Sequence, residues 1–410
     1  MLFVMNKPLR RSFVLFLLFF SVGINSSTAQ GFVSVQGQIL DKDSKDAIPL
    51  AIVSIQHGGF STAVNKEGYF NFKFPFIVLD SAEVTIAALG YKSLKMNARE
   101  LSRTELNNLS LTKAPLIETT LGISNAKSLV QSAIDSMKSN NSLQALLQSG
   151  FYRETASLED IGVVKIKEAV LRVERFPEEK DRPDRIKVLK NRQLNWKGQS
   201  EKVNSWQFLN GPAVACRAIE TELPHFLTKN MISKYEYEVD SMLTYFDGLE
   251  LYSVNFKPKS PKLRGGRVGK IYIEPSSRAI VRLEYELTKK GLNEVIGKGL
   301  SNVKLTGESL KYTSQYRNAG DYWVLAENNV FVDLVYEEKL DNKFKTRAHW
   351  ELRYVAMEST DLKRGGVTDL ELLLSTENFG NSRSLDSSTW GIHNFLPPTE
   401  EMILILDHLR

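Results

Sequence analysis

The chain has 410 residues, 42% of them hydrophobic and 25% charged, which is typical of a globular protein, so disorder is not expected by default. Its formal net charge is +5, but the first 29 residues carry three basic residues and no acidic one, so 5 − 3 leaves +2 for the remainder. A nearly neutral chain lacks the electrostatic signature of nucleic-acid binding, and no nucleic-acid partner is expected.

Residues 1–29 have the pattern of a secretory signal peptide. Basic residues precede an apolar run of about ten residues, Phe13–Val22, which is too short to cross a bilayer. Small side chains at Ser27 and Ala29 predict cleavage between Ala29 and Gln30, with an uncleaved anchor as the alternative. No later run reaches about 18 apolar residues, so the sequence predicts no transmembrane span after signal cleavage.

Residues 30–113 predict a small antiparallel β-sandwich. Their hydrophobic residues alternate with a period near two, in short runs separated by turn signals. Gly58-Gly59 and Glu67-Gly68 supply turn positions where φ can be positive. The expected strands lie within residues 33–40, 51–58, 61–74, 82–89 and 107–113.

Residues 114–140 change character. Pro115 and the loss of alternation indicate a linker, after which apolar residues recur at helical spacing from Leu129 to Met137. The sequence predicts one amphipathic helix of about four turns, with Ser124 or Asn125 as its N-cap.

Residues 141–410 predict a β-rich domain of unknown function. Apolar and charged residues alternate within 235–242, 278–287 and 344–357, so each of these strands is expected to have one solvent-exposed face. Asp247-Gly248 predicts a hairpin turn, and Pro397-Pro398 predicts the start of a terminal helix. The expected fold class is mainly β: a small sandwich, then a larger antiparallel sheet or open-barrel domain with a few helices.

Cys216 is the only cysteine of the chain. An exported protein with one thiol has no intramolecular disulfide, so packing must stabilise its fold. The small apolar neighbours of Cys216 favour a buried, inert thiol over a nucleophile.

The first domain closely resembles the carboxypeptidase-like regulatory domain, a module similar to transthyretin-like and carbohydrate-binding-like β-sandwiches and abundant in exported Bacteroidota proteins. The residues that carry this resemblance are Gly37, Asp41, Pro49, Leu50, Ala51, Val53, Ile55, Asn65, Glu67, Gly68, Phe70, Gly90 and Tyr91. Asn65-Lys66 departs from the Thr-Asp that is common in the family, which weakens the expectation of a ligand at that loop. The resemblance implies no peptidase activity, because that chemistry belongs to a separate catalytic domain.

The second domain resembles an uncharacterised Bacteroidota family of exported proteins. This resemblance is carried by the segment SGFYRE, in which Phe151, Tyr152, Arg153 and Glu154 are the signature residues. Residues 266–287 are similar to the lipoprotein-carrier type of open β-barrel, which implies strands around a lipid-holding cavity.

The sequence contains no motif of a catalytic, cofactor or metal site, so no catalytic residue, cofactor or metal is expected. The five histidines are far apart and show no metal-ligand spacing, although a dispersed site assembled by the fold is an alternative. They are His57, His225, His349, His393 and His408.

Several charged and aromatic residues have two interpretations. Arg153 and Glu154 could orient a polar ligand, but a strand with aromatic residues in the core and charges in water is favoured. Residues 257–270 hold six basic residues that could touch anionic lipid headgroups, although a solvated hairpin loop is favoured. Trp206 is the first candidate for carbohydrate stacking. The carboxylates available for catalysis are Glu154, Glu159, Asp160 and Glu168.

Two functions follow from these observations. The first is a non-enzymatic, exported docking or binding protein of the periplasm or the periplasmic face of the outer membrane, with an envelope protein, a glycan or a lipid as partner. The alternative is a hydrolase of envelope glycans, and a purely structural adaptor, which differs from the first function only in lacking a cavity, also stays open. If side chains fill the interior of the larger sheet, the first hypothesis can no longer include an apolar ligand held there. Burial of Glu154 or Glu168 beside a second acid in a cleft would favour the second.

Overall fold

The computed structural model describes residues 31–55, 59–119, 125–141, 145–177, 182–195, 211–296, 303–320, 322–338, 345–361 and 379–409. The predicted signal peptide lies outside the described residues, as do His57, Ser124, Trp196 and Trp206. The fold is mainly β, with 53% strand, 16% helix and large antiparallel sheets that do not close, which confirms the predicted fold class.

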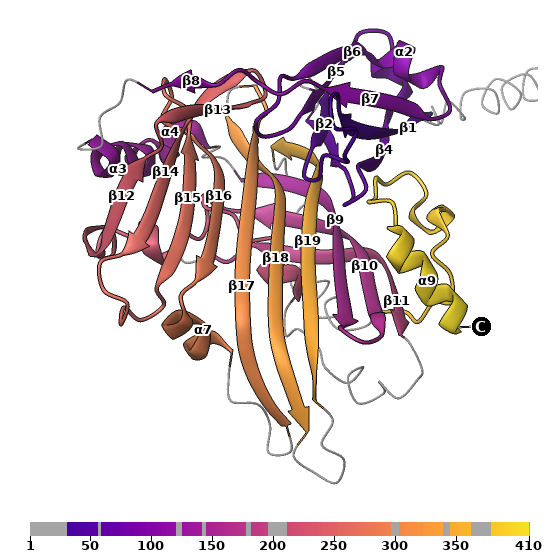
Figure 1. The fold of residues 1–410 in the computed structure, drawn as a ribbon. Coiled ribbons are helices and arrows are strands. Elements are labelled where there is room, and N and C mark those ends of the chain that lie inside the picture. The colour runs from indigo at the N-terminus through magenta and orange to yellow at the C-terminus, as the bar shows by residue number, and fades with distance from the viewer. Residues whose placement is uncertain are drawn as a thin grey trace, which may run out of the picture.

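The N-terminal part forms the sandwich, at the upper right of Figure 1. Its core lies between the two sheets and includes Val35, Phe72 and Ile86. The first strand pairs antiparallel with the fourth and parallel with the seventh, which alternation alone could not indicate. One sheet contains β4 (Tyr69–Pro75), β1 (Phe32–Asp41) and β7 (Asn107–Leu111), and the other contains β6 (Leu94–Asn97), β5 (Glu83–Ala87), β2 (Ile52–Ile55) and β3 (Phe60–Ala63). Two short helices, η1 (Phe76–Val78) and α2 (Ala98–Ser102), connect strands of the sandwich.

The rest of the chain forms one long, curved antiparallel sheet. Strands β12 and β13 both pair with β14 at one end, and the short β8 (Ile117–Glu118) pairs with β13. At one residue pair, Phe60 with Glu358, β3 of the sandwich joins β19, so the two parts share a sheet. From the other end the order is β11 (Arg185–Asn195), β10 (Gly162–Arg175), β9 (Leu146–Leu158), β19 (Lys345–Asp361), β18 (Trp323–Glu338), β17 (Val303–Asn318), β16 (Ile280–Leu287), β15 (Arg267–Ile273), β14 (Leu249–Pro258), then β12 (Tyr235–Val239) and β13 (Met242–Phe246).

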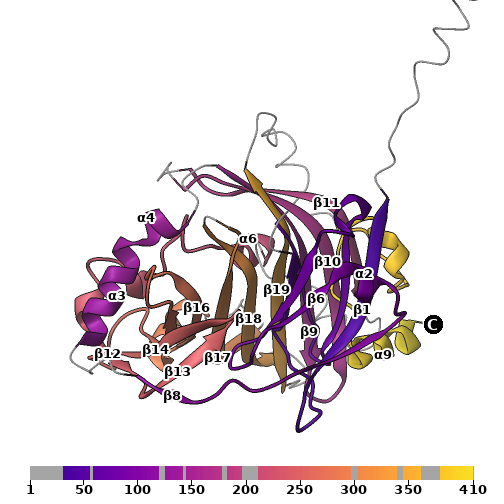
Figure 2. The same cartoon turned by 90° about the horizontal axis from the view of Figure 1, so that it is seen from above.

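The chain itself covers the inner, concave face of this sheet. Figure 2 shows α6 (Gly211–Ala215) inside the curve and α3 (Ala126–Asp135) beside β12. Side chains from both helices and from η3 (His225–Leu227) and η4 (Ile232–Lys234) belong to the same buried cluster as the sheet, including Val130, Ala215 and Phe226, as does Ile219 of the connecting turn. The interior is therefore packed.

The outer, convex face is covered in part by the C-terminal segment, which we define as residues 379–409. This segment contains η5 (Ser387–Trp390) and α9 (Glu400–Leu409), the terminal helix that Pro397-Pro398 predicted. Trp390 and Leu396 pack on Phe151 and Val355 of the sheet. The remaining helix, α7 (Lys289–Val295), connects β16 and β17.

Local predictions were confirmed at the turn and corrected at the helix. Asp247 and Gly248 have φ values of 52° and 76°, as the hairpin between β13 and β14 requires. The single predicted helix is divided at Ser136 into α3 and α4 (Met137–Asn140), and the Asn125 side chain makes no capping hydrogen bond. Within the described part of the chain, no helix combines the length and the apolar character needed to cross a bilayer.

Candidate functional site

The SGFYRE segment lies in β9, where the sandwich, the large sheet and the C-terminal segment meet. We call this three-way contact region the seam. Phe151 packs edge-on against Trp390 of the outer face, with ring centroids 5.1 Å apart. Tyr152 lies in the inner core, where its hydroxyl donates to Glu154 Oε2 at 2.9 Å. The prediction that the charged residues of this strand face solvent is wrong, because Arg153 and Glu154 are both buried. Both faces of β9 are therefore covered.

A buried network of charges crosses three strands of the outer face. Glu168 of β10 lies between Arg153 of β9 and Arg192 of β11, its direct cross-strand neighbours. Arg153 Nε donates to Glu168 Oε1 and Arg192 Nε to Glu168 Oε2, each at 2.6 Å. The arginines also donate to the carbonyls of Leu396 and Asp386 in the C-terminal segment. Burial lowers the pKa of Arg153, and the negative charge of Glu168 opposes this effect.

The network continues toward the sandwich through Arg353 of β19, which lies directly opposite Arg153. Arg353 Nε donates to Glu327 Oε1 at 2.5 Å, and its NH2 group donates to the carbonyl of Val64 in the sandwich at 2.7 Å. Burial raises the pKa of Glu327, while the charge of Arg353 holds it down. The sheet therefore contributes cations to a contact with backbone carbonyls of the sandwich.

Two more hydrogen bonds join the sandwich to the large sheet. Arg317 of β17 donates to the carbonyl of Gly59 at 2.6 Å, and burial lowers the pKa of this guanidinium to about 10. Ser61 Oγ donates to the carbonyl of Ala356 at 2.7 Å. Backbone carbonyls of the sandwich and of β19 therefore accept hydrogen bonds across the seam.

The loop where this chain departs from the family pattern makes contacts within the chain. Asn65 Oδ1 accepts hydrogen bonds from the backbone of Glu67 and Tyr69, and its Nδ2 donates to the carbonyl of Pro398 at 3.3 Å. Lys66 Nζ lies 2.9 Å from Glu351 Oε2 on β19. The loop thus contacts both the C-terminal segment and the sheet.

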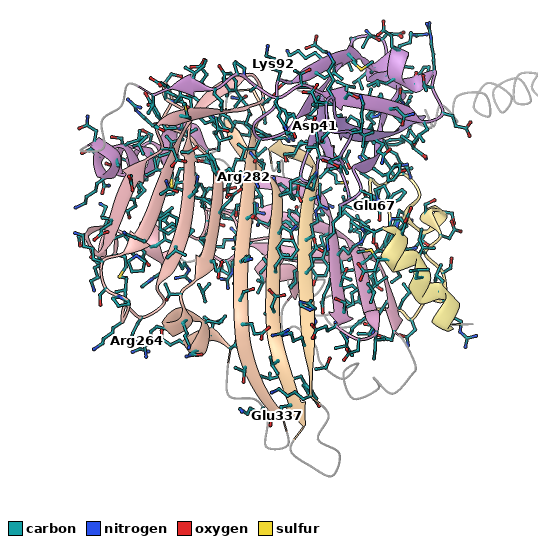
Figure 3. The ribbon with its side chains drawn as sticks, in the orientation of Figure 1. Asp41, Glu67, Lys92, Arg264, Arg282 and Glu337 are labelled. Carbon is teal, nitrogen blue, oxygen red and sulfur yellow. The ribbon has the colours of Figure 1, made fainter. Side chains whose placement is uncertain are left out.

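The C-terminal segment is also bound to the sandwich. Asn394 Oδ1 accepts from the backbone N–H of Lys73 at 2.5 Å, and its Nδ2 donates to the Lys73 carbonyl at 2.8 Å. The backbone N–H of Glu400 donates to Glu67 Oε1 at 2.9 Å, and Figure 3 shows Glu67 on the side of the sandwich toward α9. One asparagine therefore satisfies both backbone groups of a residue in β4.

The signature residues of the sandwich have structural roles. Gly37 leaves no room for a Cβ beside the backbone of β7, and Gly68 and Gly90 adopt φ values of +80° and +84°. The hydroxyl of Tyr91 donates to Asp41 Oδ2 at 2.9 Å. Hydrogen bonds from the backbone N–H groups of Ser44 and Asp43, with a smaller effect of the Tyr91 hydroxyl, lower the pKa of Asp41 to about 2. Phe70 is buried in the sandwich core, and Pro49 lies exposed in a turn.

Three small cavities lie along the seam. A space of about 10 Å³ beside Arg153 and Arg353 is large enough for one water molecule. A cavity of about 70 Å³ lies between the outer face and α9. The largest of the three, about 130 Å³, is a cleft between the sandwich, the sheet and the C-terminal segment. Its lining includes Phe32, Phe60, Lys73, Val170, Met357, Glu358, Ile392 and His393.

A second group of charges lies on the inner side, around the buried Arg175. Arg175 donates to Asp184, to Gln148 Oε1 at 3.0 Å and to the carbonyl of Cys216 at 2.6 Å. Burial raises the pKa of Glu220 to about 7 and also raises that of Asp184, and Arg175 opposes both shifts. Asp184 and Glu220 therefore both lie near Arg175, and neither residue lines any of the three cavities described above.

Glu154 lies among basic and hydroxyl groups of the inner face rather than beside a second acid. Its Oε2 accepts from Tyr152 and lies 3.9 Å from Lys167 Nζ. Burial and the charge of Lys167 lower the pKa of the nearby Lys165 to about 8, and Glu154 opposes this shift. Neither Glu154 nor Glu168 therefore has the neighbouring carboxylate that would have favoured the hydrolase hypothesis.

The structure brings one histidine beside an acid. His349 Nδ1 lies 2.6 Å from Asp333 Oδ1, and Ser309 Oγ donates to the other oxygen of Asp333. The acid stands between the other two groups, so this row lacks the Ser–His contact of a nucleophilic triad. Among the described residues, no group of three or more His, Cys, Asp or Glu side chains could hold a metal ion.

The other predicted features are placed as follows. Cys216 is buried, and burial raises the pKa of its thiol. Residues 257–270 comprise the end of β14, the β14–β15 connection and the start of β15. Arg264 of the connection pairs with Glu294, and Lys270 of β15 pairs with Asp240. Figure 3 shows Arg264 at the end of the sheet away from the sandwich. Trp323, Trp350 and Trp390 are buried in cores.

Arg192, Arg353, Lys73 and Asn394 were not predicted as site residues. They come from strands and loops far apart in sequence, and only the strand register places them at the seam. The alternation of β19 did indicate which residues share its faces. It did not indicate what covers them.

No protein-family model and no curated protein matches this chain. Among solved structures, the chain is similar to a DUF1329 family protein from Desulfovibrio piger, at 11% identity and a TM-score of 0.23, over 61% of this chain and 96% of that one. It is also similar to a Bacteroides fragilis protein of unknown function proposed to be membrane-associated, at 9% identity and a TM-score of 0.15, over 80% of this chain and 97% of that one. Likenesses at these TM-scores support no conclusion about fold or function.

Proposed function

We propose that this protein is an exported, non-enzymatic binding protein of the cell envelope that contacts its partner through its outer surface. The observation that carries this proposal is the filled interior of the large sheet. Where a lipid carrier would hold its ligand, α3 and residues 211–234 of this chain pack side chains such as Phe226 and Ile219. An apolar ligand held inside the sheet is therefore not part of the proposal.

We further propose that residues 30–113 are a carboxypeptidase-like regulatory domain that serves here as a docking module. The turn glycines Gly68 and Gly90 and the contact of Tyr91 with Asp41 support this assignment. The loop that could bind a ligand instead contacts Pro398 and Glu351. In this chain the sandwich and the C-terminal segment form one continuous outer surface with the sheet.

The hydrolase hypothesis has less support. Glu168 is held between two arginines, and each of its carboxylate oxygens already accepts a hydrogen bond from one of them. Glu220 has the raised pKa of a general acid, but it lies beside Arg175 and lines none of the three cavities of the seam.

Export and lack of enzymatic activity can be tested in one preparation. The tagged chain, expressed in a Bacteroidota host, is expected in the envelope fraction with Gln30 as its N-terminal residue by mass spectrometry. An Ala29→Asp variant should stay uncleaved. Lipid extraction of the purified protein should yield less than one lipid per chain. A cytoplasmic protein would overturn the proposal, as would release of sugars from purified envelope glycans that Glu220→Gln abolishes.

A further inference from the structure

Four apolar side chains from three separate segments are exposed around the 130 Å³ cleft of the seam. Phe32 of β1 and Ile392 of the C-terminal segment both line the cleft, with exposed fractions of 40% and 58%. Phe76 and Ile77 of η1 are 59% and 80% exposed. They adjoin Phe32, because Phe32 pairs with Pro75 and the Phe76 N–H donates to the carbonyl of Gly31 at 2.7 Å. Single exposed apolar residues are ordinary, but a group formed by tertiary contact indicates an interaction surface.

Basic residues lie beside this apolar group at its Ile392 end. Lys73 lines the cleft and donates to the carbonyl of Gly391, and Lys190 approaches the same residue. Burial and the charge of Lys190 lower the pKa of Lys73, and burial and both lysines lower that of His393. The only carboxylate among the described residues that line the cleft is Glu358, and burial raises its pKa. The cations here repel one another, so a bound anion would be stabilised.

We propose that this face, Phe32, Phe76, Ile77 and Ile392 with Lys73 and Lys190, docks on an anionic phospholipid membrane surface. This inference rests on the proposed function, because an exported envelope protein meets such a surface. A cleft of 130 Å³ is smaller than the usual site of a small molecule. Protruding aromatic and branched side chains bordered by lysines have the composition of an interfacial binding surface, where apolar insertion and attraction to anionic headgroups act together.

Vesicle sedimentation of the purified mature chain tests this inference. We expect the protein to sediment with vesicles of phosphatidylethanolamine and phosphatidylglycerol, about 3:1, and to remain unbound with phosphatidylcholine alone. Binding should weaken as salt rises from about 0.1 M to about 0.5 M, because salt screens charges at a surface. The Phe76→Ser/Ile77→Ser double variant should bind at least roughly tenfold more weakly, through loss of apolar insertion. Lys190→Glu should also weaken binding.

Matched variants separate this face from other surfaces. Leu116→Ser removes a side chain that is 80% exposed elsewhere, and Lys127→Glu reverses an exposed charge on α3, so both should bind like the wild type. If binding is absent, or is unchanged in the Phe76→Ser/Ile77→Ser variant, the inference is wrong. Loss of binding in Lys262→Glu instead would assign it to the β14–β15 connection. The vesicle assay uses purified protein, so a negative result would contradict membrane docking without contradicting export of the protein.

Discussion

Glu168 illustrates how single residues determine this site. Glu168 and the exposed Glu159 are the same type of residue. The two carboxylate oxygens of Glu168, however, are buried and accept hydrogen bonds from Arg153 and Arg192. Removing one member of such a network leaves the others buried without a counter-charge, which costs far more than breaking a surface pair. The identity of the side chain therefore matters less than its partners.

We predict that Glu168→Gln lowers the free energy of unfolding by about 3–5 kcal/mol, because two guanidinium groups lose their common counter-charge. Urea denaturation monitored by circular dichroism measures this change. Glu159→Gln is the control, since Glu159 and its partner Arg347 are both about half exposed, and it should leave stability nearly unchanged. Equal effects of the two substitutions would contradict the buried network.

Glu220 gives a prediction of pH dependence. Its folded pKa of about 7 lies above the ordinary value of 4.5, so the folded chain retains a proton that the unfolded chain loses. The free energy of unfolding should fall between pH 4.5 and 7, by up to about 3 kcal/mol, and level off above pH 7. Glu220→Gln should remove this contribution and stabilise the protein at pH 8 but not at pH 4.5.

Urea unfolding at several pH values from 4.5 to 8 tests this prediction. Glu222→Gln changes a neighbouring carboxylate whose side chain is 61% exposed, so it should keep the slope of the wild type. The assignment fails if Glu220→Gln and the wild type show the same dependence on pH.

Among the structural elements, the C-terminal segment determines how much of the outer face of the large sheet is exposed to solvent. Alternation correctly indicated that Ala348, Trp350 and Leu352 of β19 face one core. The opposite face was expected in water, but the C-terminal segment and the sandwich cover its upper part, with Trp390 fully buried. A strand pattern reports which residues share a face, whereas the covering element comes from elsewhere in the chain.

Trp390→Ala should lower the free energy of unfolding by about 3–5 kcal/mol, because it removes a fully buried side chain that packs on Phe151 and Arg192. Hydrogen exchange should increase first in residues 379–409. Ile392→Ala, two residues away, alters a side chain that is 58% exposed and should change stability by less than about 0.5 kcal/mol. Unchanged exchange in Trp390→Ala would show that the segment is held by other contacts.

At the scale of the whole molecule, the sandwich and the large sheet are joined by hydrogen bonds to backbone groups. Arg353 reaches Val64, Arg317 reaches Gly59, and the N–H of Gly90 donates to the carbonyl of Tyr245 at 2.7 Å. Because buried cations would be left without partners if the parts separated, opening of the seam is costly.

We therefore predict that the sandwich and the upper part of the large sheet unfold together. Native-state hydrogen exchange with mass spectrometry should give β4 and β19 similar opening free energies. Arg353→Met should lower protection in both strands, because Glu327 and the Val64 carbonyl lose their donor. Lys345→Met changes a residue at the far end of β19 and should leave β4 unaffected. Loss of protection in β19 alone would indicate two independent units.

The sequence by itself determined the local features of this protein. Alternation with a period of two specified the strands, and Asp247-Gly248 and Glu67-Gly68 specified tight turns, because these signals act between near neighbours. It also indicated the inward residues of β16 and β19. Only the tertiary structure decided that the interior of the sheet is filled by residues 211–234, and that Arg153, Glu168 and Arg192 meet beneath the C-terminal segment. Such contacts depend on strand register and on segments hundreds of residues apart, and alternation carries no information about either.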